Sequence, residues 1–168
     1  MEKLTQSYMH RGGTEPLVGA TIPEHFAAVV QRFADREALV SKHQKRRLTY
    51  AELAAAIDQL ARGLLGLGFV RGDRIGVWST NNIEWLLLQM ATARIGVILV
   101  NINPAYRKKE LAFSLQRSEV QGLFVIPAFH NSDYVAMLVE LIPQLRHSPA
   151  ATLKLDLLPF LRRSGRGH

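Results

Sequence analysis

Short apolar runs alternate with amphipathic stretches between residues 74 and 142, and this alternation limits the possible folds more than any other feature of the chain. Each apolar run is bounded by turn-forming residues, which is typical of strands buried in a parallel sheet. Strands are expected at residues 74–79, 97–101 and 122–126, and helices at residues 83–94, 108–117 and 133–142. This order predicts an α/β fold of three layers, with a mostly parallel sheet flanked by helices and joined by right-handed crossovers.

A β-hairpin and a long helix are expected before this alternation begins. Two runs at residues 38–41 and 47–50 flank a polar stretch, which favours an N-terminal β-hairpin. Thr49 and Glu52 form a capping-box sequence, in which the hydroxyl and the carboxylate each satisfy a free backbone N–H at a helix start. Apolar residues then recur at helical spacing until two glycines end the pattern. The apolar residues are Leu53, Ile57, Leu60, Leu64 and Leu67, and the glycines are Gly66 and Gly68.

The composition indicates one cytoplasmic domain with a core. The 168 residues are 48% hydrophobic and include no cysteine, which excludes a disulfide framework and a thiolate zinc site and favours a reducing compartment. The first sixteen residues lack the apolar core of a signal peptide. Residues 83–102 are the most apolar stretch, but Glu84, Gln89, Arg94 and Gly96 interrupt it. We therefore expect a helix followed by a buried strand there, and no transmembrane segment.

Positive charge is concentrated near the C-terminus. The formal net charge is +7, and residues 144–168 contain five Lys and Arg residues against Asp156 alone. A cationic surface can attract nucleic acid, but no aromatic residue is interleaved among Arg162, Arg163 and Arg166 to stack on bases. We therefore expect no nucleic-acid partner.

Polar and turn-forming residues follow each of the three expected strands. Ligands of parallel sheets bind beyond the carboxyl ends of the strands, so residues 79–82, 101–106 and 127–131 form a candidate ligand rim. Helix capping is the alternative interpretation, because the same residue types cap helices. Trp78 and Trp85 lie close to the rim in the sequence. They can line a pocket, although large aromatic side chains more often fill a core.

No catalytic motif accompanies the rim. The glycines within residues 66–72 have one residue too many for a dinucleotide fingerprint, and they follow a helix rather than a strand. The sequence contains neither a P-loop nor a nucleophile elbow. Turn formation explains Asp73, and positions near helix starts explain Glu52, Glu84 and Glu110. We assign no catalytic, cofactor-binding or metal-binding residue, and the histidines are scattered singly at His10, His25, His43, His130, His147 and His168.

Several short motifs occur together in one order along the chain. They are Ala38-Leu39-Val40, Leu48-Thr49-Tyr50-Ala51-Glu52-Leu53, Leu67-Gly68, Gly72-Asp73-Arg74-Ile75, Asn82-x-Glu84-Trp85, Gly96 and Asn103-Pro104-Ala105-Tyr106 with Glu110-Leu111. In this order the chain resembles the N-terminal lobe of ATP-dependent, AMP-forming acyl-CoA synthetases of the adenylate-forming superfamily. The resemblance covers residues 14–143, with a weaker match in the tail. Residues 100–106 are most similar to the bacterial medium- to long-chain fatty acyl-CoA ligase branch.

The resemblance implies a division of the chain and a parent reaction. Residues 1–22 are expected to form an N-terminal arm, 23–143 a partial synthetase N-terminal domain, and 144–168 a basic tail that leaves the family frame after 163. Enzymes of this family use ATP and Mg²⁺ to adenylate a fatty acid and release pyrophosphate, and then transfer the acyl group to coenzyme A. Their phosphate loop, ribose-binding acidic residue and C-terminal lysine lie downstream of the matching region. We therefore expect a truncated fatty acyl-CoA synthetase that binds none of these cofactors and is inactive alone.

Two alternatives stay open. The chain can be a non-catalytic interaction module, or the N-terminal half of a split synthetase completed by a separately encoded downstream half. An active minimal enzyme would require groups near Asn103 and Tyr106 to replace the phosphate loop, and nothing in the sequence supplies pre-organised phosphate donors.

Overall fold

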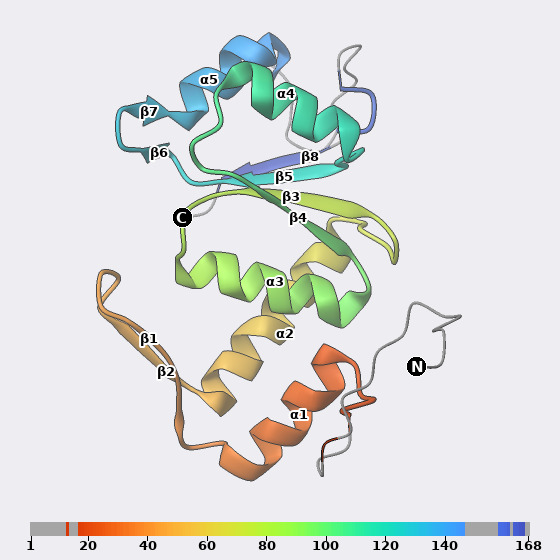
Figure 1. Ribbon diagram of the computed structural model, residues 1–168, viewed down its shortest axis with the longest axis vertical. Helices are drawn as coiled ribbons and strands as arrows, with labels where there is room; N and C mark the ends of the chain where they lie inside the picture. The colour runs from red at the N-terminus through yellow and green to blue at the C-terminus, as the bar shows by residue number, and fades with distance from the viewer. Residues whose placement is uncertain (1–12, 14–16, 147–157, 162, 167–168) are drawn as a thin grey trace, which may run out of the picture.

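The computed structural model describes residues 13, 17–146 and 158–161, together with the backbone of residues 163–166 (Figure 1). Most of the expected N-terminal arm and basic tail therefore lies outside the described residues, and the division of the chain into those parts stays a prediction. Among the described residues, none of the helices has the length and apolarity needed to cross a membrane.

Helices and strands are interspersed along the described chain. The helices are α1 (Ile22–Phe33), α2 (Tyr50–Gly66), α3 (Ile83–Ile95), α4 (Lys108–Arg117), α5 (Tyr134–Leu141) and the 3₁₀ helix η1 (Pro143–Arg146). The strands are β1 (Glu37–Ser41), β2 (Arg46–Thr49), β3 (Arg74–Trp78), β4 (Ile98–Ile102), β5 (Gly122–Val125), β6 (Ala128–Phe129), β7 (Ser132–Asp133) and β8 (Arg163–Arg166).

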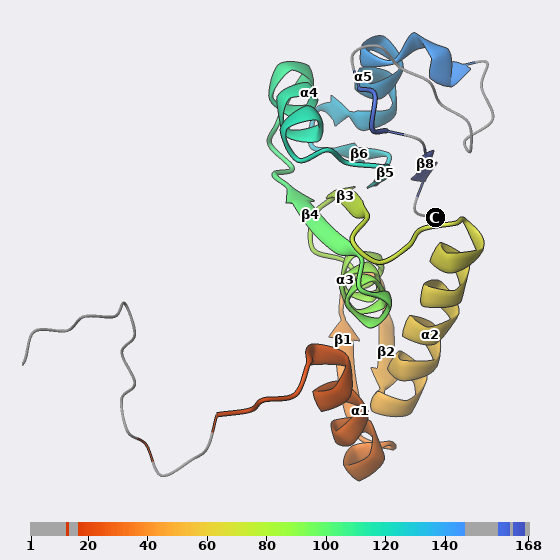
Figure 2. The same ribbon diagram turned by 90° about the vertical axis from the view of Figure 1, so that its right-hand side faces the viewer.

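A four-stranded parallel sheet in the order β4-β3-β5-β8 forms the middle layer. Helices α4 and α5 lie on one side of the sheet and α2 and α3 on the other, as both ribbon views show (Figure 1, Figure 2). The β1–β2 hairpin is antiparallel and lies against α2. These features confirm the predicted three-layer α/β fold with its N-terminal hairpin.

Each face of the sheet has its own hydrophobic core. On the α4–α5 side, Trp78, Leu111 and Tyr134 are fully buried. On the α2–α3 side, Ile57, Leu64 and Ile75 are buried to a similar degree. Alternate residues of β3 thus serve the two cores, as expected for a strand covered on both faces.

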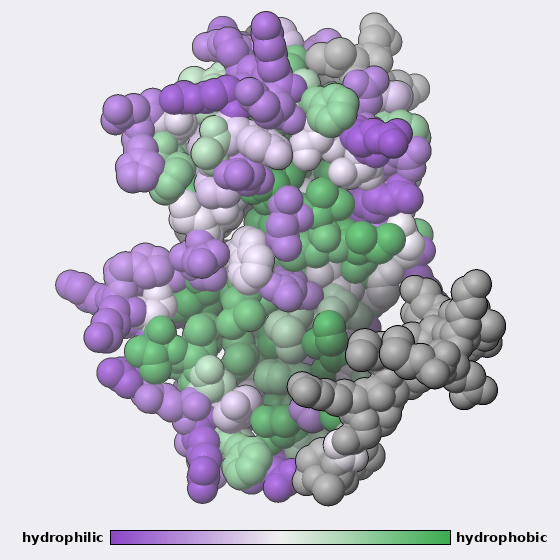
Figure 3. Space-filling view, in the orientation of Figure 1, coloured by the Kyte–Doolittle hydropathy of each residue, from purple (hydrophilic) through white to green (hydrophobic). Residues whose placement is uncertain are grey.

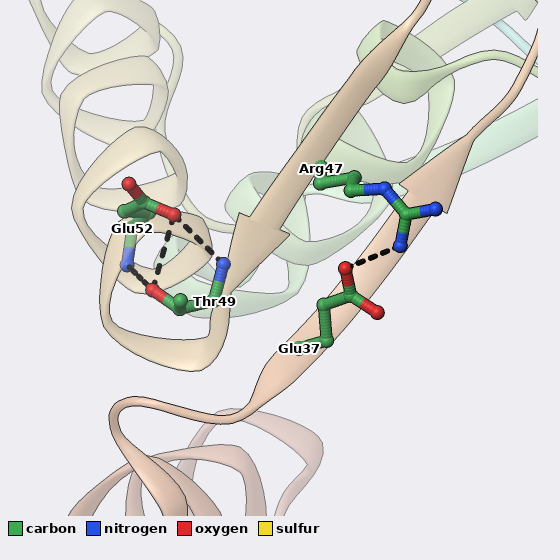
Figure 4. Close-up of polar contacts among 4 residues, drawn as sticks. All are labelled: Glu37, Arg47, Thr49 and Glu52. Carbon is green, nitrogen blue, oxygen red and sulfur yellow. Dashed lines mark hydrogen bonds and ion pairs between the residues drawn. The ribbon is translucent and has the colours of Figure 1, made fainter.

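The start of α2 follows directly from its sequence. The Thr49 hydroxyl accepts a hydrogen bond from the Glu52 backbone N–H at 3.2 Å, and the Glu52 carboxylate accepts one from the Thr49 backbone N–H at 2.8 Å (Figure 4). The capping box is therefore formed as predicted. Beside it, Arg47 and Glu37 form an ion pair at 2.5 Å across the hairpin.

Two expectations about burial are wrong. Leu67 is 47% exposed, because it is the C-cap of α2 and no longer follows the helical stripe. Strand β4 is only partly buried, because it lies at the edge of the sheet: Ile98 is 49% exposed, although Ile102 is buried. In the view of Figure 3, apolar side chains gather over β4 and α3, whereas hydrophilic ones cover the hairpin tip and the α4–α5 end.

Our sequence analysis also did not predict helix α1 or strand β8. Helix α1 has its own capping box, in which Thr21 and Glu24 exchange hydrogen bonds, with a proline in the first turn. That signal was present in the sequence and could have been found. Strand β8 pairs in parallel with β5 through residues that we expected to leave the family pattern.

Candidate functional site

The strands β3, β4 and β5 are parallel, so their carboxyl ends lie at the same end of the sheet, where the candidate rim was predicted. Trp78 at the end of β3 is stacked on Tyr134, with ring centroids 3.6 Å apart and ring planes 2° apart. Both side chains are fully buried, so Trp78 belongs to the core and does not line a pocket.

This ring pair holds the loop after β4. The Trp78 indole N–H donates a hydrogen bond to the Asn103 carbonyl at 3.1 Å, and the Tyr134 hydroxyl donates one to the Pro104 carbonyl at 2.5 Å. Burial raises the pKa of the Tyr134 hydroxyl above its ordinary value of 10.0, while the positive charge of Arg107 opposes that shift. The hydroxyl is therefore a neutral donor at physiological pH.

Most polar side chains of the rim close turns or cap helices. Asn82 caps α3 by accepting a hydrogen bond from the Trp85 backbone N–H at 2.7 Å, and its amide donates to the Ser79 hydroxyl at 2.9 Å. Asn103 closes a turn by accepting from the Ala105 backbone N–H at 2.9 Å. These contacts agree with the capping and turn interpretation of residues 79–82 and 101–106.

The third rim segment leads into α5 in the same manner. The carbonyl of Pro127 accepts a hydrogen bond from the Tyr134 backbone N–H at 3.0 Å. The Asp133 carboxylate, next to the segment, accepts one from the Ala136 backbone N–H at 2.8 Å and caps α5. A hydrogen bond thus connects the segment 127–131 to α5, the helix that carries Tyr134.

Gln44 links the hairpin to the rim, and sequence reasoning missed it. Its amide oxygen accepts hydrogen bonds from the Ser41 hydroxyl at 3.1 Å and from the Ile83 backbone N–H at 2.8 Å. Its amide nitrogen donates to the Glu84 carboxylate at 2.7 Å. Gln44 precedes Ile83 by 39 residues, so no local pattern could have indicated this contact.

The carboxylates singled out in the sequence have structural partners. Asp73 accepts a hydrogen bond from the Val70 backbone N–H at 3.0 Å, and Glu110 accepts one from the Arg107 backbone N–H at 3.2 Å. Glu52 belongs to the capping box, and Glu84 accepts from Gln44. Within the described part of the chain, no group of three or more His, Asp or Glu residues could hold a metal ion.

An apolar cavity of about 520 Å³ opens next to residues 79–82, on the α2–α3 side of the sheet. Helix α2 and helix α3 form its walls, β3 and β5 contribute to its floor, and Arg46 of the hairpin lies at its margin. Trp85 lines this cavity, in contrast to the buried Trp78. The lining residues are Arg46, Ala56, Gln59, Leu60, Gly63, Val77, Ser79, Asn82, Glu84, Trp85, Leu87, Leu88, Phe124, Val125 and Ile126.

A parallel sheet covered by helices on both faces, with capped helix starts beyond the carboxyl ends of its strands, defines a three-layer α/β fold. The chain belongs to the AMP-binding enzyme family, whose sequence pattern matches residues 26–165. It corresponds to the N-terminal part of acyl-CoA ligases of that family.

Named relatives agree with this membership. The chain is 39% identical over 155 residues to the mitochondrial medium-chain acyl-CoA ligase ACSF2 of Mus musculus, covering 92% of this chain and 25% of the relative. It is 33% identical over 146 residues to YngI of Bacillus subtilis, described as an acyl-CoA synthetase, covering 87% of this chain and 27% of the relative. The chain therefore spans about a quarter of the length of these relatives.

Solved structures give the same fold. A protein of Rhodopseudomonas palustris, described as a long-chain-fatty-acid CoA ligase, superposes with a TM-score of 0.71 at 25% identity, over 89% of this chain and 33% of that chain. The N-terminal domain of FACL13 from Mycobacterium tuberculosis has a TM-score of 0.70 at 21% identity, over 88% and 33% respectively, and supports the fold alone.

Proposed function

We propose that this chain forms the first part of the N-terminal lobe of an AMP-forming fatty acyl-CoA synthetase and does not catalyse the reaction by itself. The observation that carries the proposal is the family match over residues 26–165, in a chain that spans a quarter of its relatives' length. In the parent reaction, a fatty acid reacts with ATP to form an acyl adenylate and pyrophosphate, and coenzyme A then displaces AMP.

The geometry of the rim supports the proposal that this chain does not catalyse the reaction by itself. Stabilising the charge that develops on transferred phosphate groups requires pre-organised donors aimed at one point. The side chains of Asn82, Asn103 and Asp133 accept hydrogen bonds from backbone N–H groups of their own turns and helices. We therefore assign the binding of ATP, Mg²⁺ and coenzyme A to parts of the enzyme outside the region that this chain matches.

A chimera tests the proposal. Residues 26–165 of this chain replace the matching segment of the mouse medium-chain acyl-CoA ligase, and acyl-CoA formation is measured with fatty acids from short to long. We expect the chimera to form acyl-CoA, because the segment occupies an equivalent place in the lobe. A chimera that unfolds cooperatively on heating but forms no acyl-CoA would contradict the proposal.

The location of the protein is also a proposal. We infer a cytoplasmic protein from the composition, because a sequence without cysteine is compatible with a reducing compartment. The names of several relatives place those proteins in mitochondria. Fractionation of cells that express the tagged chain distinguishes the two locations, and recovery with mitochondria would contradict our inference.

A further inference from the structure

Positive charge is concentrated at the tip of the β1–β2 hairpin, where an open groove of about 470 Å³ lies on the surface. Four of the residues that line this groove are exposed Lys or Arg residues, and none of its described lining residues is acidic. We call it the hairpin groove. Hydrophilic side chains cover this tip at the left of the molecule (Figure 1, Figure 3). The lining residues are Val40, Ser41, Lys42, Lys45, Arg46 and Arg47.

Most of the charge in the hairpin groove is not neutralised by carboxylates. Arg47 forms the ion pair with Glu37 across the hairpin. Among the ion pairs of the described residues, none includes Lys42, Lys45 or Arg46. Three positive charges therefore remain available to an external anion.

Hydrogen bonds hold the tip of the hairpin in place. Gln44 accepts a hydrogen bond from the Ile83 backbone N–H at 2.8 Å and donates one to the Glu84 carboxylate at 2.7 Å, so the tip is connected to the start of α3. Within the turn, the Lys45 backbone N–H donates to the Lys42 carbonyl at 3.2 Å. A backbone that is already fixed reduces the entropy lost when its side chains bind an anion.

Lys45 has a backbone conformation that favours glycine. Its φ is +52°, in the left-handed region, where a side chain costs free energy that glycine does not. Residues other than glycine that are held in this region cluster at active sites and ligand-binding sites. The position thus allows stability and binding to be separated, because glycine would relax the backbone and also remove a cation from the hairpin groove.

We propose that the hairpin groove binds a ligand that carries two or more phosphate groups. An arginine guanidinium matches two phosphate oxygens and a lysine supplies a compact charge, and the groove offers both. Such a ligand is either a soluble polyphosphorylated molecule or a phosphorylated lipid headgroup. No aromatic side chain among the described lining residues can stack on a base, which argues against single-stranded nucleic acid. None of the lining residues belongs to the candidate rim, so the inference does not depend on the proposed function.

Two binding measurements on the purified chain distinguish the two sources of phosphate. Calorimetric titration with inorganic tripolyphosphate detects a site for a soluble polyphosphate. Co-sedimentation with phosphatidylcholine vesicles that contain phosphatidylinositol bisphosphate, compared with phosphatidylcholine vesicles alone, detects a site for a lipid headgroup. We expect at least one of these phosphorylated probes to bind, and the stronger of the two identifies the source.

Substitutions then locate the site. Lys42→Gln and Lys45→Gly should each weaken binding of the phosphorylated probe by about threefold, and together by about tenfold, because each removes one exposed charge. Lys109→Gln is the matched control, since Lys109 is an exposed lysine of α4 that does not line the hairpin groove. This control should leave the affinity unchanged.

Thermal unfolding separates a lost contact from a damaged fold. Lys45→Gly should raise the midpoint of unfolding by about 2–4 °C while it weakens binding, because it relieves the left-handed conformation. If the midpoint falls instead, Lys42→Gln decides the outcome, and an unchanged affinity in that variant would overturn the inference.

Three further results would overturn the inference. Failure of both phosphorylated probes to bind would remove the site. Equal weakening by Lys109→Gln and by the two hairpin substitutions would mean that only the net charge of the chain matters. Duplex DNA that binds more tightly than both probes, with the same dependence on Lys42 and Lys45, would identify a nucleic-acid backbone as the ligand instead.

Discussion

Gly122 and Gly63 differ in how much space a side chain would find at each position. A Cβ atom at Gly122 would lie 2.4 Å from the ring of Phe69, which is buried, whereas a Cβ atom at Gly63 would meet nothing within 4 Å. We expect Gly122→Ala to lower the free energy of unfolding by about 1–3 kcal/mol through overpacking. Gly63→Ala should raise it by up to about 1 kcal/mol, because alanine favours the helix. Urea denaturation of both variants measures the difference, and equal effects would contradict this account.

The ring and the hydroxyl of Tyr134 are expected to contribute separately to the stability of the fold. Tyr134→Phe keeps the stacked ring on Trp78 but removes the hydrogen bond to the Pro104 carbonyl. We expect a loss of about 1 kcal/mol, the usual net value of one hydrogen bond. Tyr134→Ala should cost about 3–5 kcal/mol, because it also leaves a cavity beside Trp78. Thermal unfolding followed by tryptophan fluorescence compares the two, and the account fails if Phe is as damaging as Ala.

The charge of Glu52 makes stability depend on pH. Hydrogen bonds from the Thr49 backbone and hydroxyl lower the pKa of Glu52 below its ordinary value of 4.5. A carboxylate whose folded-state pKa is depressed stabilises the protein above its unfolded-state pKa, and that contribution is lost as the pH falls through the folded-state value. Glu52→Gln should therefore reduce stability at neutral pH and have little effect well below pH 4.5. Urea unfolding of the wild-type chain and of Glu52→Gln at both pH values measures the difference in their free energies of unfolding. A difference that grows in acid would contradict this prediction.

At the scale of elements, we expect the edge strand β4 to promote self-association of the isolated chain. Among the described residues, no strand pairs with its outer edge, and Ile98 of β4 is 49% exposed. We expect Ile98→Lys to reduce self-association, because a lysine on an edge strand opposes strand pairing. Leu65→Lys is the control, since Leu65 is 52% exposed but lies on helix α2, outside the sheet. Light scattering at several concentrations measures the effect, and equal behaviour of the two variants would exclude the β4 edge as the cause.

The elements also show what the sequence could predict. Hydrophobic periodicity and capping residues placed α2, α3, α4 and β3 correctly, because those signals lie within each element. The edge position of β4 and the link from Gln44 to Ile83 depend on contacts between distant segments. Periodicity carries no information about strand order, so the burial of β4 was predicted wrongly. It also carries no information about contacts between side chains that are distant in the sequence, so the contacts of Gln44 were not predicted.

On the scale of the whole molecule, side chains of the candidate rim hold turns and helix starts in place. Stacking of Trp78 on Tyr134 fixes the loop after β4, and Asn82 and Asp133 cap the helices that follow β3 and β5. Hydrogen bonds thus hold the segments at the carboxyl ends of the strands, and the apolar cavity of about 520 Å³ opens beside Ser79 and Asn82 on the α2–α3 side. This combination fits one part of a lobe whose catalytic groups come from elsewhere in the polypeptide.

The central claim is tested most directly by acid-dependent release of pyrophosphate from ATP and Mg²⁺. The purified chain is assayed alone and mixed with a separately produced polypeptide that carries the rest of the mouse ligase, with fatty acids from short to long. We predict no release by either polypeptide alone and acid-dependent release by the mixture. Release by the chain alone would contradict the claim that its catalytic groups lie elsewhere, and a mixture that forms a stable complex without releasing pyrophosphate would contradict the claim that the chain is a working part of a synthetase.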